Sequence, residues 1–279
     1  MPQWKAPIEE WGFDGTATPP WFMVKQTFHG ESKTLNLDFA NGKLVRSVNE
    51  RIVTIRELLP DAGSRVFGFS GRSPHRTRIE VRDPKTNGLE STLEVSVKSK
   101  KTYIINFFFV EDKSRDRTIH QPSILDGLID KLNTIYNDQT NVFFELGGSE
   151  DFKIDITLSD VVYERGDAGE GGLYDKHIWK KIFAKTRGRL DELNVFFVPA
   201  HPVDKNPNAI PYTDDERNCV IEDGKEFIEI ILPHAVGRML GCPPDFKNKH
   251  HLMFFDFNLR RDGNFIPKHC ANIMNSSSI

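Results

Sequence analysis

The stretch that decides the fold is Phe227–Phe255, which reads FIEIILPHAVGRMLGCPPDFKNKHHLMFF. Apolar residues recur at helical spacing through its first half, which predicts a largely buried helix carrying His234. Gly241 marks the end of that helix, because glycine adopts the left-handed conformation of a helix C-terminus without strain. The apolar run around Met253 then returns the chain to the core in a turn. Pro233 has no backbone donor, so we expect the regular helix to begin beside it or to kink there.

Upstream of this stretch, strand and helix patterns alternate. Four strands are expected, at Tyr103–Val110, Asn141–Leu146, Leu193–Pro199 and Asn218–Glu222. The first is too apolar and aromatic for a strand with one wet face, so it belongs in the centre of a sheet. A helix over Ser123–Tyr136 follows it, with Ser123 as the N-cap. A loop at Gly147–Gly172 and a helix near Asp175–Lys185 separate the second strand from the third.

The first 98 residues have a different pattern. From Met23 to about Lys98, apolar and polar residues alternate with period two between turn sequences such as Asn41-Gly42, which predicts a β-sandwich-like domain over residues 22–98. Residues 1–21 combine tryptophans with prolines, which favours an extended arm. We expect its indole rings to cover a groove on the same chain, with docking on a partner as the alternative.

Residues 99–279 form the second domain, so the fold class is α+β. A short packing helix at Ile266–Met274 closes it.

Composition places the chain among ordinary globular proteins, with 38% hydrophobic and 28% charged residues. The formal net charge of -3 gives no global attraction to nucleic acid, so we expect no nucleic-acid partner. No apolar run reaches the roughly 20 residues of a membrane span, and we see no signal-peptide pattern. Cys219, Cys242 and Cys270 form no CxxC pair, so we expect a reducing compartment without a disulfide framework. The expected location is cytoplasmic as synthesised, with signal-independent export as the alternative.

Over roughly residues 100–257, the chain resembles the metzincin clan of zinc endopeptidases. The shared order is a strand, a long helix, a second strand, further strands and a histidine-bearing helix, followed by a methionine turn. In that clan the helix carries H-E-x-x-H-x-x-G-x-x-H above the methionine turn. His234 matches the first histidine, Gly241 the helix stop and Met253 the turn. An alternative register places Met274 in the turn. The resemblance implies a metzincin-like α/β domain with a mostly parallel twisted sheet, a backing helix and an active-site-type helix.

Three positions depart from the clan's pattern. Ala235 replaces the glutamate, Arg238 the second histidine and Pro244 the third. Alanine accepts no proton, arginine offers only donors and proline has no side-chain ligand. One imidazole is left where catalytic zinc needs three protein ligands and a water. The resemblance therefore implies a catalytically impaired homologue with vestigial site positions and no metal or other cofactor.

A decayed site is the first hypothesis for this helix. The Arg238 guanidinium then takes the place of the metal, and a carboxylate, from Asp245 or Asp256, meets its charge. An engineered knock-out would explain Ala235 but not the other two replacements.

A rearranged metal site, with zinc as the metal, is the rival hypothesis. Its ligands would join His234 from the chain that follows the helix: Cys242, Asp245, His250, His251 and His269. Adjacent histidines in an extended chain point to opposite faces, so at most one of the pair at 250 and 251 would reach the helix.

Two classes of function follow from these hypotheses. The first is a non-catalytic metzincin-like protein that binds a peptide or protein partner by strand addition along an exposed sheet edge. The second is an enzyme with an altered site, such as a secreted bacterial effector whose β-domain positions a hydrolase. Activity that disappears on His234→Ala would favour the second class, and binding without turnover the first.

Overall fold

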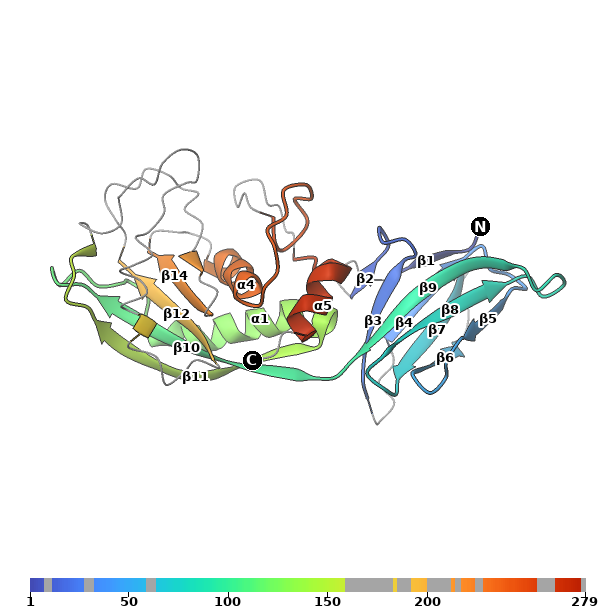
Figure 1. The fold of residues 1–279 in the computed structure, drawn as a ribbon, viewed down its shortest axis with the longest axis horizontal. Helices are drawn as coiled ribbons and strands as arrows, with labels where there is room; N and C mark the ends of the chain where they lie inside the picture. Colours follow the sequence, from blue (N-terminus) through green and yellow to red (C-terminus); the bar gives the residue numbers. More distant parts are fainter. Residues whose placement is uncertain are drawn as a thin grey trace. The chain divides into compact units, whose positions relative to one another are not determined.

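The computed structural model describes residues 1–7, 12–27, 33–58, 64–158, 183–184, 192–199, 212–213, 217–223, 228–254 and 264–276. The chain divides into two compact units (Figure 1). The first consists of Met1–Lys101, Ile135–Val142 and Phe265–Asn275, and the second of Thr102–Thr134, Phe143–Asn264 and Ser276–Ile279. The class is α+β as predicted, with an all-β N-terminal part followed by a sheet that contains parallel strands.

The first unit contains two β-sheets with a shared core. The strands are β1 (Gln3–Lys5), β2 (Phe13–Asp14), β3 (Trp21–Lys25), β4 (Lys33–Asp38), β5 (Leu44–Ser47), β6 (Val53–Glu57), β7 (Ser64–Gly71), β8 (Arg76–Arg82) and β9 (Leu89–Lys98). One sheet has the order β1-β4-β7-β6 and the other β2-β3-β9-β8-β5. Phe22 of one sheet meets Phe69 of the other edge to face, with ring centroids 5.2 Å apart. The alternating apolar residues of both sheets thus bury a common interior, as the period-two pattern predicts.

Among the first 21 residues, the described ranges 1–7 and 12–21 belong to the same unit as these sheets and do not form a separate arm. They are extended, as the prolines predict, but β1 pairs with β4 and β2 pairs with β3. Trp4 and Trp21 are buried, and Trp21 Nε1 donates a hydrogen bond to Ser96 Oγ at 2.8 Å. The indoles therefore lie in the chain's own core, whereas Trp11 lies outside the described residues. Strands of two or three residues are too short to produce a period-two signal, which is why the sequence suggested an arm.

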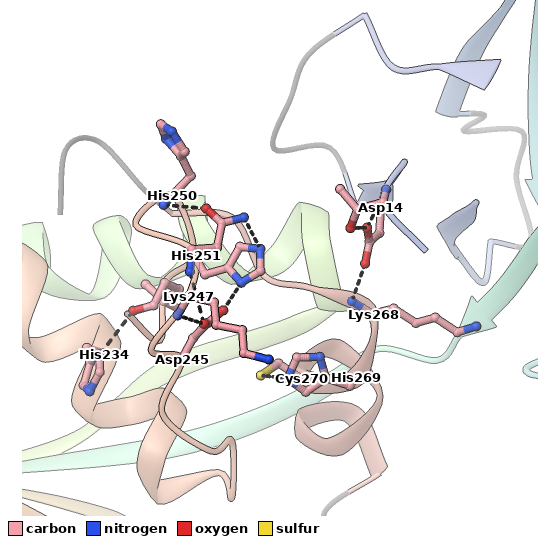
Figure 2. Close-up of polar contacts among 12 residues, drawn as sticks. Asp14, His234, Asp245, Lys247, His250, His251, Lys268, His269 and Cys270 are labelled. Carbon is pink, nitrogen blue, oxygen red and sulfur yellow. Dashed lines mark hydrogen bonds and ion pairs between the residues drawn. The ribbon is translucent and has the colours of Figure 1, made fainter. Parts of the chain in front are cut away.

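The C-terminal helix α5 (Lys268–Ser276) packs in the first unit, two residues later than the predicted helix. Its first backbone amide, Lys268 N, donates to Asp14 Oδ2 at 3.2 Å (Figure 2), and Lys268 Nζ pairs with Glu94 at 2.7 Å. Asn275 Nδ2 donates to Thr140 O at 3.0 Å. Residues far apart in the sequence therefore supply both ends of this helix with partners.

The second unit is built on a five-stranded sheet with the order β11-β10-β12-β14-β13. The strands are β10 (Lys101–Glu111), β11 (Val142–Lys153), β12 (Leu193–Val198), β13 (Tyr212–Thr213) and β14 (Asn218–Glu222). Strands β10, β12 and β14 run parallel, and β13 is antiparallel to β14. Phe108 and Phe196 stack across β10 and β12, with centroids 4.6 Å apart. The aromatic strand Tyr103–Val110 is central, as predicted.

Helix α1 (Leu125–Thr140) and the strand after it differ from the prediction at their ends. A 3-10 turn, η1 (Pro122–Ile124), precedes α1 and includes Ser123, so Ser123 is not the N-cap. Strand β11 continues past Gly147 into the predicted loop, because it pairs with β10. A Cβ at Gly147 would lie 2.3 Å from Ile104 Cγ2, so this close approach of the two strands requires glycine. Apart from residues 183 and 184, the predicted helix Asp175–Lys185 lies outside the described residues.

None of the helices within the described ranges is long and apolar enough to cross a membrane.

Candidate functional site

The helix that carries His234 is α4 (Ile228–Met239), and it contacts β13 and β14. It begins before Pro233, not beside it as predicted. Ala235 and Val236 are fully buried, as is Leu232 on the other side of the proline. Packing of this apolar helix outweighs the single backbone donor that Pro233 removes.

His234 is held by the turn that follows the helix. Its side chain is buried, with 2% of the residue exposed. Its Nδ1 lies 3.2 Å from Leu252 O (Figure 2). A carbonyl only accepts hydrogen bonds, so Nδ1 carries the proton and the lone pair of the neutral ring lies on Nε2. This is the tautomer that metal-binding histidines adopt, and it is equally compatible with a core histidine.

Helix α4 ends at Met239, and Gly241 lies in the turn that terminates it, as predicted. Gly241 has a φ of 86°, its amide donates to Arg238 O at 2.9 Å, and the amide of Cys242 donates to Gly237 O at 2.9 Å. These two bonds define a Schellman motif, which needs a residue in the left-handed conformation at this position. Arg238 is half-buried, and its Nη1 donates to Cys242 O at 2.9 Å. Its guanidinium therefore binds the C-terminal end of α4, where a cation also interacts favourably with the helix dipole.

The segment after the helix folds back in a turn beside α4. Asp245 N donates to Met253 O at 2.7 Å, and Asp245 forms a parallel bridge with Phe254. Leu252 and Met253 are buried within this turn, whereas Met274 lies in helix α5. Through Leu252 O, the turn sets the orientation of His234.

Asp245 is the centre of a hydrogen-bond network in this segment. Its Oδ1 accepts from Lys247 N at 2.7 Å and Asn248 N at 3.2 Å, and its Oδ2 contacts His251 Nδ1. Asn248 Nδ2 contacts His251 Nε2 at 2.9 Å, so both ring nitrogens are engaged. Burial raises the pKa of Asp245, but the hydrogen bonds from Lys247, His251 and Asn248 outweigh it and the net pKa lies below the ordinary value. His250 is exposed and points away from the network (Figure 2).

These contacts correct one part of the decayed-site hypothesis. Asp245 pairs with His251 and does not meet the charge of Arg238. The other carboxylate considered for Arg238, Asp256, lies outside the described residues. The remaining vestigial positions supply no ligand atoms, because Ala235 is fully buried alanine and Pro244 is a half-buried proline.

The proposed rearranged metal site is only partly brought together. Asp245 and His251 are in contact, whereas His234 is bonded to Leu252 O and His250 is exposed. Across the part of the chain that the structure describes, no three His, Cys, Asp or Glu side chains are grouped as a metal site requires. His269 lies in α5 of the first unit.

The cysteines contradict the expectation that the chain has no disulfide. Cys242 and Cys270 are each disulfide-bonded, whereas Cys219 is buried and not part of a disulfide. Sequence spacing does not detect such a disulfide, because no CxxC pair or dense cysteine framework accompanies it.

Sequence reasoning also missed a polar pair at the carboxyl ends of the parallel strands. Asp223 directly follows β14 and is 4% exposed, and His120 Nε2 lies 3.6 Å from its Oδ1. The available signal was an acidic residue immediately after a buried strand, at the sheet edge where open α/β sheets bind ligands.

No protein-family model matches this chain, and no curated protein matches it either.

Proposed function

We propose that this chain is a metzincin-like protein without zinc-peptidase chemistry, which acts by binding a peptide or protein partner. The observation that carries the proposal is the pair His234 and Arg238, one helical turn apart on α4. These are the positions at which the clan places two zinc ligands. Here the second side chain is a guanidinium, which offers only donors and binds Cys242 O.

The element order supports the metzincin part of the proposal. Strand β10, helix α1, strand β11, strands β12, β13 and β14, and helix α4 follow one another in the order that motivated the resemblance. The Gly241 helix stop and the buried turn at Met253 support it as well.

The residues present do not fit the clan's zinc ion. Of the three ligand positions, only His234 has a side chain that could donate a lone pair to a metal. Ala235 provides no carboxylate to accept a proton from a bound water. No hydrolytic step through a metal follows from this donor set.

Binding by strand addition is supported by the position of β13. This strand pairs with β14 and ends the sheet in the observed strand order. An extended peptide adds to such an edge through main-chain hydrogen bonds.

The binding function is tested by selecting, from a random library, extended 12-residue peptides that bind the intact chain. Strand addition uses every second amide of the peptide, so the odd-numbered and even-numbered amides should differ in importance. N-methylation of one of these two sets should lower the affinity by at least about tenfold, and N-methylation of the other set should change it little. Equal loss for both sets, or none for either, contradicts strand addition. Cleavage of the selected peptides that disappears in His234→Ala contradicts the non-catalytic proposal and favours the hydrolase alternative.

The disulfide-bonded cysteines bear on where the protein acts. Disulfides persist in oxidising compartments and are rare in a reducing cytosol. We therefore propose export, the alternative that also suits a secreted effector. Alkylation of free thiols in cell fractions tests this, since a cytosolic pool with all three cysteines reduced contradicts it.

A further inference from the structure

A buried carboxylate holds the chain segment that follows β10 against the ends of two other strands. Asp223 Oδ1 accepts a hydrogen bond from Thr118 Oγ1 at 2.6 Å, and its Oδ2 accepts one from Ile119 N at 2.7 Å. The amide of Asp223 donates to Val198 O at 2.9 Å, at the end of β12. One residue thus connects the segment 118–120 to the carboxyl ends of β12 and β14.

His120 covers this carboxylate. Its Nε2 lies 3.6 Å from Asp223 Oδ1, and its side chain is 15% exposed. Its ring lies on the buried ring of Phe197, with centroids 4.7 Å apart. Its amide donates to Thr118 Oγ1 at 3.2 Å, so the hydroxyl that binds Asp223 also fixes the backbone of His120.

We propose that residues 118–120 and Asp223 form an acid-sensitive latch, which is closed while the His120–Asp223 pair holds at most one proton and opens when the pair takes a second. When the pair holds no titratable proton, His120 is neutral and the Asp223 carboxylate is stabilised by its hydrogen bonds from Thr118 and Ile119. With one proton, the pair has no net charge. A second proton leaves an imidazolium beside a neutral carboxyl, which is a buried charge without a counter-ion.

The two pKa shifts act on the latch in opposite directions, because the lowered pKa of His120 makes acid favour the open state and the raised pKa of Asp223 makes acid favour the closed state. Burial lowers the pKa of His120, and the charge of Asp223 opposes this only in part. Burial raises the pKa of Asp223 against the hydrogen bonds from Thr118 and Ile119 and the charge of His120. Among the described residues of β10, β12 and β14, no further charged group perturbs either pKa. When the segment leaves, both side chains reach water and together bind two protons, whereas the closed pair holds one. A pH below the ordinary pKa of a carboxyl group therefore favours the open state.

Opening would uncover Phe197 and the carboxyl ends of β12 and β14. In open α/β sheets this edge is where ligands bind. The latch would therefore control access to that edge, and it is independent of the proposed peptide binding at β13.

Amide hydrogen exchange on the intact chain between about pH 7 and about pH 3 tests the latch, because this range includes the ordinary pKa of an aspartate. Because opening takes up one proton, protection of the Ile119 amide should fall by up to about tenfold per pH unit after correction for intrinsic exchange. The Phe144 amide, which donates to Asn133 Oδ1 at 2.8 Å in the same unit, serves as the control and should stay protected. Parallel loss of protection at Phe144 would identify global unfolding and overturn the proposal, as would an Ile119 amide that stays protected at about pH 3.

Variants of His120 and Asp223 separate the effect of charge on the latch from the effect of packing against Phe197. His120→Phe keeps an aromatic ring for Phe197 but cannot form an imidazolium, so acid should no longer lower the protection of Ile119. His120→Gln should behave in the same way and replaces it if the phenylalanine variant does not fold. Asp223→Asn imitates the protonated carboxyl, so Ile119 should stay protected while His120 is neutral and should lose protection when His120 takes up a single proton. A wild-type pH dependence in either His120 variant would overturn the proposal.

Discussion

In the first unit, the free energy of unfolding should rise steeply with pH, and replacing Lys33 with methionine should remove this rise. Lys33 is 8% exposed, and its Nζ donates to Asp138 O near the C-terminal end of α1 and lies 5.9 Å from the centroid of the Phe22 ring. Burial lowers the pKa of Lys33 from 10.5 to about 7, since the attraction of Asp138 offsets burial only in part and Lys25 adds repulsion. The folded unit therefore resists protonation of this amine.

The sign and size of the effect follow from the two pKa values. Between about pH 7 and pH 10.5 the unfolded chain holds a proton that the folded chain lacks, so the free energy of unfolding rises with pH by up to about 1.4 kcal/mol per unit. Below about pH 7 the full cost of burying the ammonium is present, on the order of 5 kcal/mol for a difference of about 3.5 between 10.5 and about 7. Between pH 7.5 and pH 9.5, integration over this window gives a gain of about 2 kcal/mol.

The assay is urea unfolding at pH 7.5, 8.5 and 9.5, followed by tryptophan fluorescence. Three of the chain's 4 tryptophans lie in the first 21 residues, so the signal reports mainly on this unit. The stability difference between wild type and Lys33→Met should change by about 2 kcal/mol across this range, whereas the partly exposed Lys5→Met control should keep the wild-type slope. Lys98, whose pKa burial lowers to about 8, contributes equally to all three proteins. A Lys33→Met variant with the wild-type slope would refute this explanation.

Three further predictions concern the second unit and the cysteines. Gly241→Ala should lower the free energy of unfolding by about 1–2 kcal/mol in urea titrations, because alanine is strained at a φ of 86°. Asn133→Ala should cost about 1–3 kcal/mol by the same measurement, because Asn133 satisfies both the amide and the carbonyl of Phe144. Alkylation of denatured, unreduced protein should modify Cys219 alone by mass spectrometry, and a second modified cysteine would contradict the disulfide.

The parts of the fold that could be predicted are those in which local signals and packing agree. The run Leu193–Val198 and the segment Asn218–Glu222 are buried strands with the expected bounds, give or take one residue, because a central parallel strand is apolar on both faces. Gly241 could be assigned as a helix stop because few other residues adopt its backbone conformation.

The parts that could not be predicted depend on contacts between distant residues. Strand β11 continues through polar residues beyond Gly147 because it pairs with β10, and pairing leaves no apolar signal at a sheet edge. Thr118 and Asp223 are 105 positions apart, so no motif spacing could join them. Proximity in sequence favours Arg238 as the partner of Asp245, whereas the turn brings the Asp245 carboxylate to His251.

We propose that α4 and the turn at Met253 are a metzincin-like scaffold in which Arg238 and Pro244 stand in place of two of the three zinc ligands. The most direct test is to restore the ligands with Arg238→His and Pro244→His, leaving Ala235 unchanged so that no carboxylate enters the core. Zinc content is then measured on tag-free protein, with circular dichroism to check folding. We predict about one zinc per chain in the double variant and none in the wild type, and loss of the zinc when His234→Ala is added. A folded double variant that binds no zinc, or a wild-type chain that already holds one, would contradict the account.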